Sequence, residues 1–209
     1  MTKKKYVNIE FSVIAGELKG KRITAPDLEV TRPPLSRLRK AIFDFLEPHV
    51  AGEGYLDLFS GTGSYLFEAV SRGAGSALGL EKERLLVESI NRQAVELGVG
   101  GRLRCLREDV FAGIERLHTG PKRWKVIMMA PPQYLDLVHK TLVVLRRAPV
   151  SAAEGMIVCQ HDTSETRKID FLDFPILQQR KYGNTTYTVL SPGIPDEEAA
   201  TGASSSGPE

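Results

Sequence analysis

Residues 55–63 constrain the fold of this chain more than any other segment. They read Tyr-Leu-Asp-Leu-Phe-Ser-Gly-Thr-Gly, an apolar strand that runs into a carboxylate and then two glycines, and a helical pattern follows at once. Gly61 and Gly63 permit a tight turn and close approach of the backbone to a ligand, as in nucleotide-binding strand–loop–helix units. Asp57 adds a negative charge beside that loop. The segment predicts an α/β fold with a nucleotide-like ligand; an ordinary glycine-rich turn is the alternative.

A fold that binds nicotinamide dinucleotides is the closest rival. Its fingerprint has Gly or Ala at the third glycine position, where the helix packs closely on the strand, and this chain has Leu66 there. Further along, the apolar residues 77–80 end in Glu81. A carboxylate at that place suits paired ribose hydroxyls in either fold. It could equally cap the following helix, but its position after the glycine loop favours ribose binding.

Strand and helix patterns alternate along the chain. The predicted strands are 8–24 (one or two strands), 55–59, 76–80, 102–106, 124–129, 156–160, 174–181 and 185–190, and the predicted helices are 36–46, 64–72, 82–97 and 134–147. This order predicts a mostly parallel twisted sheet with helices on both faces and a C-terminal antiparallel hairpin. In such sheets, ligands bind at the carboxyl ends of the strands. Asp57, Glu81, Asp109 and a Pro-Pro turn at 131–132 all follow predicted strands, which is the strongest evidence for a site.

Composition limits the class of protein. A chain of 209 residues with 42% hydrophobic content can bury one substantial core. No run of 18 apolar residues suggests a membrane span, and the first residues carry no apolar signal segment. Cys105 and Cys159 are too few and too far apart for a disulfide framework or a zinc site, and the histidines lack metal-ligand spacing. We expect a cytoplasmic protein that binds no metal.

Charge is distributed unevenly. Residues 1–40 carry ten Lys or Arg against four Asp or Glu, whereas residues 192–209 carry four acids and no base. A basic arm on a near-neutral body is typical of nucleic-acid binding, although a solvated charged segment has the same composition. Arg32, Arg37 and Arg39 bracket two prolines and open a helix, so we predict that they contact RNA. The acidic tail is poor in apolar residues and is expected to be disordered.

Further segments make the pattern specific. They are Ile-Ala-Gly-Glu-Leu-Lys-Gly-Lys-Arg at 14–22, Thr-Arg-Pro-Pro-Leu-Ser-Arg-Leu-Arg-Lys-Ala-Ile-Phe at 31–43, the glycine loop at 57–63 with Glu68 and Ser-Arg-Gly-Ala at 71–74, and Arg-Lys-Tyr-Gly-Asn-Thr-Thr at 180–186. Over roughly residues 12–191, the chain resembles the bacterial 16S rRNA guanine-N2 methyltransferases of the RsmD type. The resemblance implies a Rossmann-like class I methyltransferase fold. The implied parts are an N-terminal basic arm, hairpin and helix (1–50), the methyltransferase domain (51–191) and a disordered acidic tail (192–209).

The resemblance also implies the cofactor S-adenosylmethionine. In that family, the acidic residue of the glycine motif serves the ammonium of the methionine moiety, which assigns this role to Asp57. Asp109 follows a strand and could serve only as a helix cap, but its place in the order of strands suggests contact with the adenine amino group. The predicted cofactor-binding residues are Asp57, Phe59, Gly61, Gly63, Glu81, Lys82, Asp109 and Val110.

One departure from the family concerns the catalytic motif, which is normally Asp or Asn, Pro, Pro and an aromatic residue. This chain has Ala130, Pro131, Pro132, Gln133 and Tyr134. Either catalysis is lost and binding retained, or other groups accept a hydrogen bond from the target amine. The carbonyls of Ala130 and Pro131 and the side chain of Gln133 can do this, and Tyr134 can stack on a flipped base. We predict a working enzyme with all five residues in its catalytic site.

The leading hypothesis is therefore an RNA methyltransferase that modifies the exocyclic N2 of a guanine in small-subunit ribosomal RNA. Its partner would be the RNA or a small-subunit assembly intermediate, and the protein would act as a monomer away from membranes. A catalytically inactive RNA- or ribosome-binding relative is one alternative. A methyltransferase for DNA or a small molecule is the other.

Overall fold

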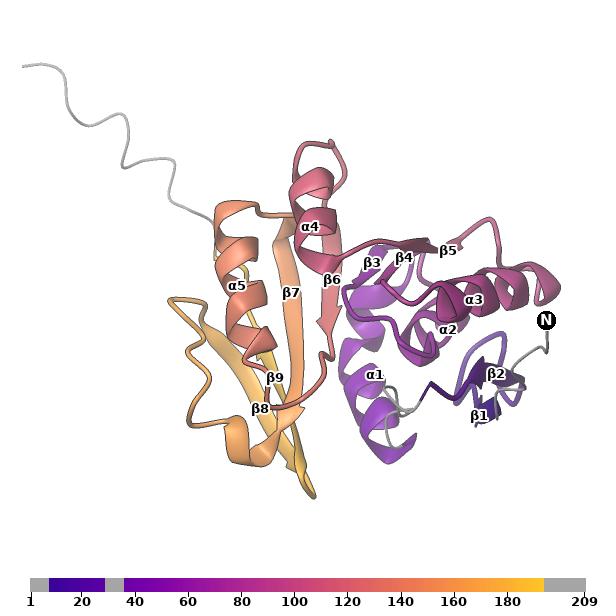
Figure 1. Cartoon of the computed structure of the whole chain (residues 1–209), viewed down its shortest axis with the longest axis horizontal. Helices are drawn as coiled ribbons and strands as arrows, with labels where there is room; N and C mark the ends of the chain where they lie inside the picture. Colours follow the sequence, from indigo (N-terminus) through magenta and orange to yellow (C-terminus); the bar gives the residue numbers. More distant parts are fainter. Residues whose placement is uncertain (1–7, 29–35, 194–209) are drawn as a thin grey trace, which may run out of the picture.

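The chain folds around a twisted seven-stranded sheet (Figure 1). The computed structural model describes residues 8–28 and 36–193. The sheet has the order β5-β4-β3-β6-β7-β9-β8; β3 to β7 run parallel, and β9 and β8 form an antiparallel hairpin at one edge. The strands are β3 (Gly54–Asp57), β4 (Ser76–Glu81), β5 (Leu103–Arg107), β6 (Trp124–Met129), β7 (Ser151–Asp162), β8 (Ile176–Tyr182) and β9 (Thr185–Leu190). Because β3 lies between β4 and β6, the strand order reverses beside it, and ligands bind at such reversal points in open α/β sheets.

Helices cover both faces of the sheet. They are α1 (Ser36–Val50), α2 (Ser64–Ser71), α3 (Arg84–Glu96), α4 (Val110–His118) and α5 (Leu137–Arg147), with a short 3-10 helix, η1 (Thr163–Glu165), after β7. Successive residues of a strand point to opposite faces. Thus Val126 and Met128 of β6 join a core cluster with α1, α2 and α3, whereas Ile127 and Met129 join a second cluster with α4 and α5.

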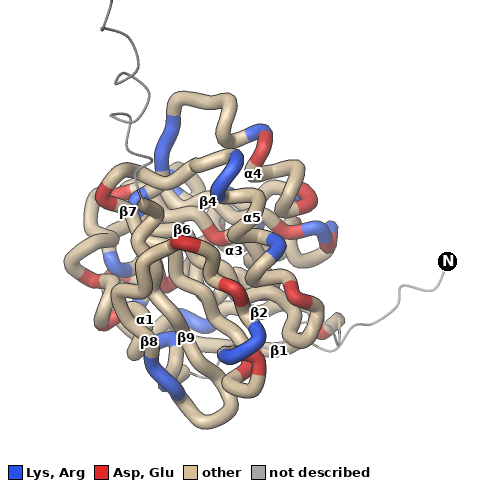
Figure 2. Tube along the Cα trace, turned by 90° about the vertical axis from the view of Figure 1, so that its left-hand side faces the viewer, with Lys and Arg blue, Asp and Glu red and all other residues tan. Residues whose placement is uncertain are grey.

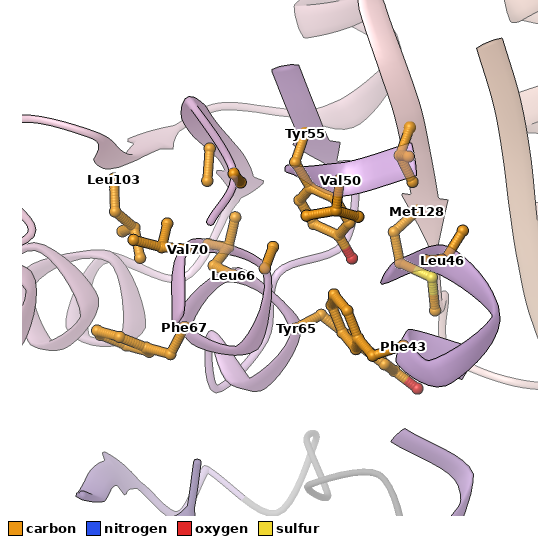
Figure 3. Packing of buried hydrophobic residues seen from close by; sticks show 14 of the residues in the cluster. Phe43, Leu46, Val50, Tyr55, Tyr65, Leu66, Phe67, Val70, Leu103 and Met128 are labelled. Atoms are coloured by element: carbon orange, nitrogen blue, oxygen red, sulfur yellow. The ribbon is translucent and has the colours of Figure 1, made fainter. Parts of the chain in front are cut away.

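Aromatic rings fill the first of these clusters beside the predicted site. Phe43 of α1 stacks on Tyr55 of β3, with ring centroids 5.9 Å apart, and lies 6.1 Å from Tyr65 of α2. Figure 3 shows these side chains packed between α1, α2 and the sheet. The position of α2 relative to β3 is therefore fixed by large buried rings.

The N-terminal hairpin forms a separate two-stranded sheet of β1 (Asn8–Ser12) and β2 (Arg22–Pro26). The Thr24 N–H donates to Gln93 Oε1 of α3 at 2.8 Å, and the Thr24 carbonyl accepts from Gln93 Nε2 at 2.6 Å. At the hairpin turn, Gly16 has φ +82°, and a Cβ there would lie 1.8 Å from the Ser71 carbonyl oxygen at the end of α2. Glycine thus lets the hairpin dock directly on α2 and α3.

The predicted fold class is confirmed, with differences in element limits. The helix predicted from residue 134 begins at Leu137, because Tyr134 and Asp136 have φ +64° and +55°, which are not helical values. Helix α4 was not predicted, although Asp109 before it is a normal helix cap. Arg32 and the predicted acidic tail beyond residue 193 lie outside the described residues. Within the described residues, no helix is long and apolar enough to span a membrane.

Candidate cofactor and base site

The loop between β3 and α2 exposes backbone to a ligand at the strand-order reversal. Gly61 has φ +50°, and Gly63, the residue before α2, has φ +80°. A Cβ on Gly63 would lie 2.8 Å from the Ile90 side chain of α3. The glycine spacing read from the sequence is therefore required by backbone conformation and by the approach of α3.

Asp57 lies at the carboxyl end of β3 and is completely buried. Neither carboxylate oxygen has a hydrogen-bond partner among the described residues. Burial raises the pKa of Asp57 to about 7; the nearby Phe59 backbone N–H lowers it in part, without a hydrogen bond of good geometry, and the charge of Glu81 raises it further. A buried carboxylate without partners is costly. A cationic ligand group, such as the ammonium of S-adenosylmethionine, matches this carboxylate in hydrogen bonding and in charge.

Glu81 connects the end of β4 to the glycine loop. One carboxylate oxygen accepts from the Gly61 N–H at 2.8 Å, and the other accepts from the Glu83 N–H at 2.9 Å. Glu83 is the residue before α3, so Glu81 holds the backbone at the start of that helix without accepting from an N–H of its first turn. Each oxygen keeps a further lone pair, so ribose binding remains compatible with this geometry and stays a prediction.

The other predicted cofactor residues lie beside these two. Asp109 caps α4, with its Oδ1 accepting from the N–H groups of Phe111 at 3.0 Å and Ala112 at 3.3 Å. Phe59 is half-buried after β3, Lys82 is exposed directly after β4, and Val110 is the buried first residue of α4. The carboxyl ends of β3, β4 and β5 thus bring all of the predicted positions to one edge of the sheet.

The predicted catalytic residues follow β6, next to that edge. Asp57 of β3 is paired with Met128 of β6, so Ala130 lies two residues beyond the level of Asp57. Ala130 packs partly buried against the first core cluster, and Pro131 is buried. Pro132 and Gln133 are exposed.

Tyr134 lies on the surface of the loop that follows β6. Its side chain is 66% exposed, and its backbone N–H donates to Glu165 Oε1 at 2.9 Å. A hydrogen bond to Asp162 raises the pKa of the Tyr134 phenol. The hollow lined by Pro131, Gln133 and their neighbours has a volume of about 10 Å³, the space of one water.

Two residues at this site were missed from the sequence. The Tyr65 hydroxyl of α2 donates to Gln160 Oε1 near the end of β7, and Gln160 lines the same hollow as Pro131. The sequence signal for Gln160 is its place at the end of the predicted strand 156–160. His161 is buried and bonds to the Asp162 carbonyl and the Thr188 hydroxyl, which is a structural arrangement.

The prediction that Arg39 contacts RNA is wrong. Its side chain is 1% exposed, with one guanidinium nitrogen donating to the Ser12 carbonyl and Nε 3.5 Å from the buried carboxylate of Glu68. Glu68 also accepts from the N–H groups of Ile14 at 2.9 Å and Ala15 at 3.1 Å. Arg39 therefore anchors the hairpin to α2 instead of facing a phosphate.

Arg37, by contrast, is exposed on α1 and is free to face a polyanion. On the side of the molecule shown in Figure 2, basic and acidic segments alternate and form no continuous basic face. Among the described residues, Arg37 is thus the predicted RNA-binding arginine that lies on the surface, and its contact with RNA stays a prediction.

Comparison with known proteins agrees with this geometry. A family model described as conserved hypothetical protein 95 matches residues 11–191. The chain belongs to this family. It is 24% identical over 153 residues to ribosomal RNA small subunit methyltransferase D of Escherichia coli K12, covering 73% of this chain and 75% of that protein. It is 26% identical over 176 residues to the putative rRNA methyltransferase YlbH of Bacillus subtilis, covering 83% and 94%.

Solved structures confirm the fold. The putative methyltransferase yhhF from Escherichia coli superposes with a TM-score of 0.75 at 20% identity, over 87% of this chain and 97% of that one. An RNA methyltransferase from Salinibacter ruber, in complex with S-adenosyl-L-homocysteine, superposes with a TM-score of 0.58 at 20% identity, over 79% and 98%. The predicted class I methyltransferase fold and the resemblance to RsmD-type enzymes are therefore confirmed.

Proposed function

We propose that this protein transfers a methyl group from S-adenosylmethionine to the exocyclic N2 of a guanine in small-subunit ribosomal RNA. The observation that carries the proposal is the buried, unpaired carboxylate of Asp57 beside the Gly61–Gly63 loop, at the strand-order reversal of a methyltransferase fold. The relatives named ribosomal RNA small subunit methyltransferase D supply the substrate class.

The cofactor would be held by groups from three strand ends. Asp57 accepts the ammonium, the N–H groups of the glycine loop lie along the ligand, and Glu81 accepts from the ribose hydroxyls while it holds Gly61. Asp109 would accept from the adenine amino group, with Phe59, Lys82 and Val110 around it. When bound, S-adenosylmethionine supplies a methyl group activated on a sulfonium.

The segment after β6 would orient the target base. An exocyclic guanine amine has its lone pair drawn into the ring, so catalysis depends on positioning and on stabilising the positive charge that develops on nitrogen. The carbonyls of Ala130 and Pro131 and the Oε1 of Gln133 are the available acceptors, and Tyr134 stacks on the base. No strong base is needed, because the ammonium-like product loses its proton to water.

RNA would reach this site along α1. Arg37 contacts phosphates, and Arg32 lies in the segment before it. The substrate is the RNA or a small-subunit assembly intermediate met in the bacterial cytoplasm, and the protein acts as a monomer. These finer assignments rest on the family and on the exposed position of Arg37.

Mass analysis of ribosomal RNA from cells that lack the protein tests the proposal. We expect one methylguanosine to disappear from small-subunit RNA, to return with the wild-type gene and to stay absent with Asp57→Asn. RNA that is unchanged by the deletion would contradict the proposal. Ala130, which lacks the polar side chain of the family motif, favours a second candidate, an inactive RNA-binding relative. In that case, the purified protein binds RNA and cofactor but transfers no methyl group.

A further inference from the structure

Gln160 of β7 lies beside Ala130, the position at which this chain departs from the family's catalytic motif. Met129 of β6 and Cys159 of β7 form the last pair between these two neighbouring strands, and Ala130 and Gln160 are the residues that follow them. Ala130 packs against the first core cluster, to which Val158 also belongs, and residues two apart on a strand share a face. Ala130 and Gln160 therefore lie side by side on the same face, at the carboxyl edge of the sheet.

The amide of Gln160 is held in one orientation. Tyr65 is buried, and burial raises the pKa of its phenol, so the phenol keeps its proton. The charge of the buried Arg39 acts on Tyr65 in the opposite sense, lowering the pKa of the phenol, but burial outweighs it. The Tyr65 proton is directed to Gln160 Oε1. Glu68 in turn fixes Arg39.

The hydrogen-bonding groups of the Gln160 amide that Tyr65 does not use face the candidate site. Its Nε2 has no hydrogen bond within the described part of the chain, and Gln160 is half-buried in the lining of the hollow formed with Pro131 and Gln133. Oε1 keeps a second lone pair, and Nε2 has two N–H groups. A side-chain amide can therefore pair with an adjacent donor and acceptor on one edge of a base.

We propose that Gln160, oriented by Tyr65, binds the target base and supplies the polar recognition that Ala130 lacks. This inference rests on the proposed function and names a specificity-determining residue for it. On guanine, the exocyclic amine and the neighbouring ring nitrogen N3 form the matching donor–acceptor pair. Oε1 accepts from the amine, Nε2 donates to N3, and the amine is held beside the Ala130 and Pro131 carbonyls.

Methyl transfer by purified variants tests this assignment. The substrate is small ribosomal subunits, or RNA extracted from them, isolated from cells that lack the protein, with radiolabelled S-adenosylmethionine. Gln160→Met keeps the length of the side chain and should lower kcat/KM for RNA by about 10- to 100-fold, the contribution of one bidentate pair. Tyr65→Phe, which removes only the orienting hydroxyl, should lower kcat/KM in the same sense by a smaller factor. Cofactor affinity, measured by calorimetry, should stay unchanged in both.

Nucleoside competition separates recognition from a structural effect. Guanosine should inhibit the wild-type protein more strongly than inosine, which lacks the exocyclic amine, and Gln160→Met should abolish this difference. Gln179→Met makes the same chemical change on the exposed strand β8 and should keep both the preference and the activity.

The outcomes are distinct. Full activity and an unchanged guanosine preference in Gln160→Met overturn the role of Gln160, while the proposed function stands. A wild-type protein that methylates neither subunits nor their RNA overturns both. A guanosine preference that is lost equally in Gln179→Met shows a nonspecific effect and also overturns the role of Gln160.

Discussion

Replacing Asp57 by asparagine should stabilise the cofactor-free protein while it weakens cofactor binding. Burial raises the pKa of Asp57 from 3.8 to about 7, so the folded protein binds the Asp57 proton more tightly than the unfolded chain does. A rise of that size corresponds to about 4 kcal/mol at roughly 1.36 kcal/mol for each tenfold change in proton affinity. The charged form of Asp57 therefore costs the folded state up to this amount when no cation is bound.

The sign of the pH dependence follows from the raised pKa. The stability contribution of Asp57 is most favourable below its unfolded pKa, falls as pH rises from about 4 to about 7, and stays at its lowest above that. Asparagine does not ionise, so Asp57→Asn should raise the free energy of unfolding at pH 8 by up to about 4 kcal/mol. The gain should shrink toward pH 5. Guanidinium unfolding followed by circular dichroism across this range measures it.

Cofactor binding should change in the opposite direction. Only the ionised carboxylate pairs with the ammonium, so wild-type affinity should be about tenfold weaker at pH 6 than on the plateau above pH 7. Asp57→Asn should lose this pH dependence and about 1.5–3 kcal/mol of charged hydrogen bonding, on the order of 10- to 150-fold in Kd. Isothermal titration calorimetry with S-adenosylmethionine tests both expectations.

Asp44 on the exposed part of α1 provides a control of opposite sign. A hydrogen bond from Lys40 lowers the pKa of Asp44, so its charged form stabilises the fold above the unfolded pKa, and that stability is lost as the pH falls through the lowered value. Asp44→Asn should therefore reduce stability slightly at pH 8 and leave cofactor affinity unchanged. If Asp57→Asn is instead less stable than the wild type at pH 8, or binds the cofactor equally well, the assignment of Asp57 is refuted.

Four further variants test other groups of α1 and of the candidate site. Arg39→Ala should destabilise the fold by about 3 kcal/mol in chemical denaturation, because it leaves Glu68 with a weakened buried pair. Arg37→Ala should instead keep stability and lower the salt slope of RNA affinity by about 0.7–1; equal stability in the two variants would contradict the buried ion pair. Glu81→Ala should weaken cofactor binding about tenfold or more in calorimetry, and an unchanged Kd would remove Glu81 from the site. Ala130→Asp should preserve or raise turnover, and transfer by this variant alone, with none by the wild type, would establish the inactive-relative hypothesis.

The candidate cofactor site could be predicted from sequence because each of its parts is local. Asp57 and Glu81 are the last residues of apolar strands, and strand ends of a parallel sheet meet at one edge without any knowledge of side-chain packing. What the sequence could not show is how each group is satisfied. Glu81 proved to hold the N–H of Gly61 as well as the start of α3, whereas Asp57 has no partner among the described residues. These opposite states come from tertiary geometry, which a strand pattern does not contain.

The pair of Tyr65 and Gln160 was invisible for a related reason. The two residues are 95 positions apart, and their contact depends on the packing of α2 against β7. Neither residue belongs to a motif with a fixed spacing. In the sequence, a glutamine at a strand end looks like an ordinary surface residue. Its contact with the buried Tyr65 phenol is seen only in the structure. Such long-range polar pairs require the three-dimensional register of the sheet.

Arg39 was misassigned because a charged side chain was taken as exposed. The buried residues of α1 are Leu38, Arg39, Ile42, Phe43, Leu46 and Val50, so Arg39 lies on the apolar face of the helix. Arg39 and Phe43 are four apart and share one face. A single arginine on an apolar helix face signals a buried acidic partner, because an unpaired buried guanidinium is costly. Glu68 is the charged residue of the mostly apolar helix α2, so these two exceptions together are the sequence signal for the ion pair that the prediction missed.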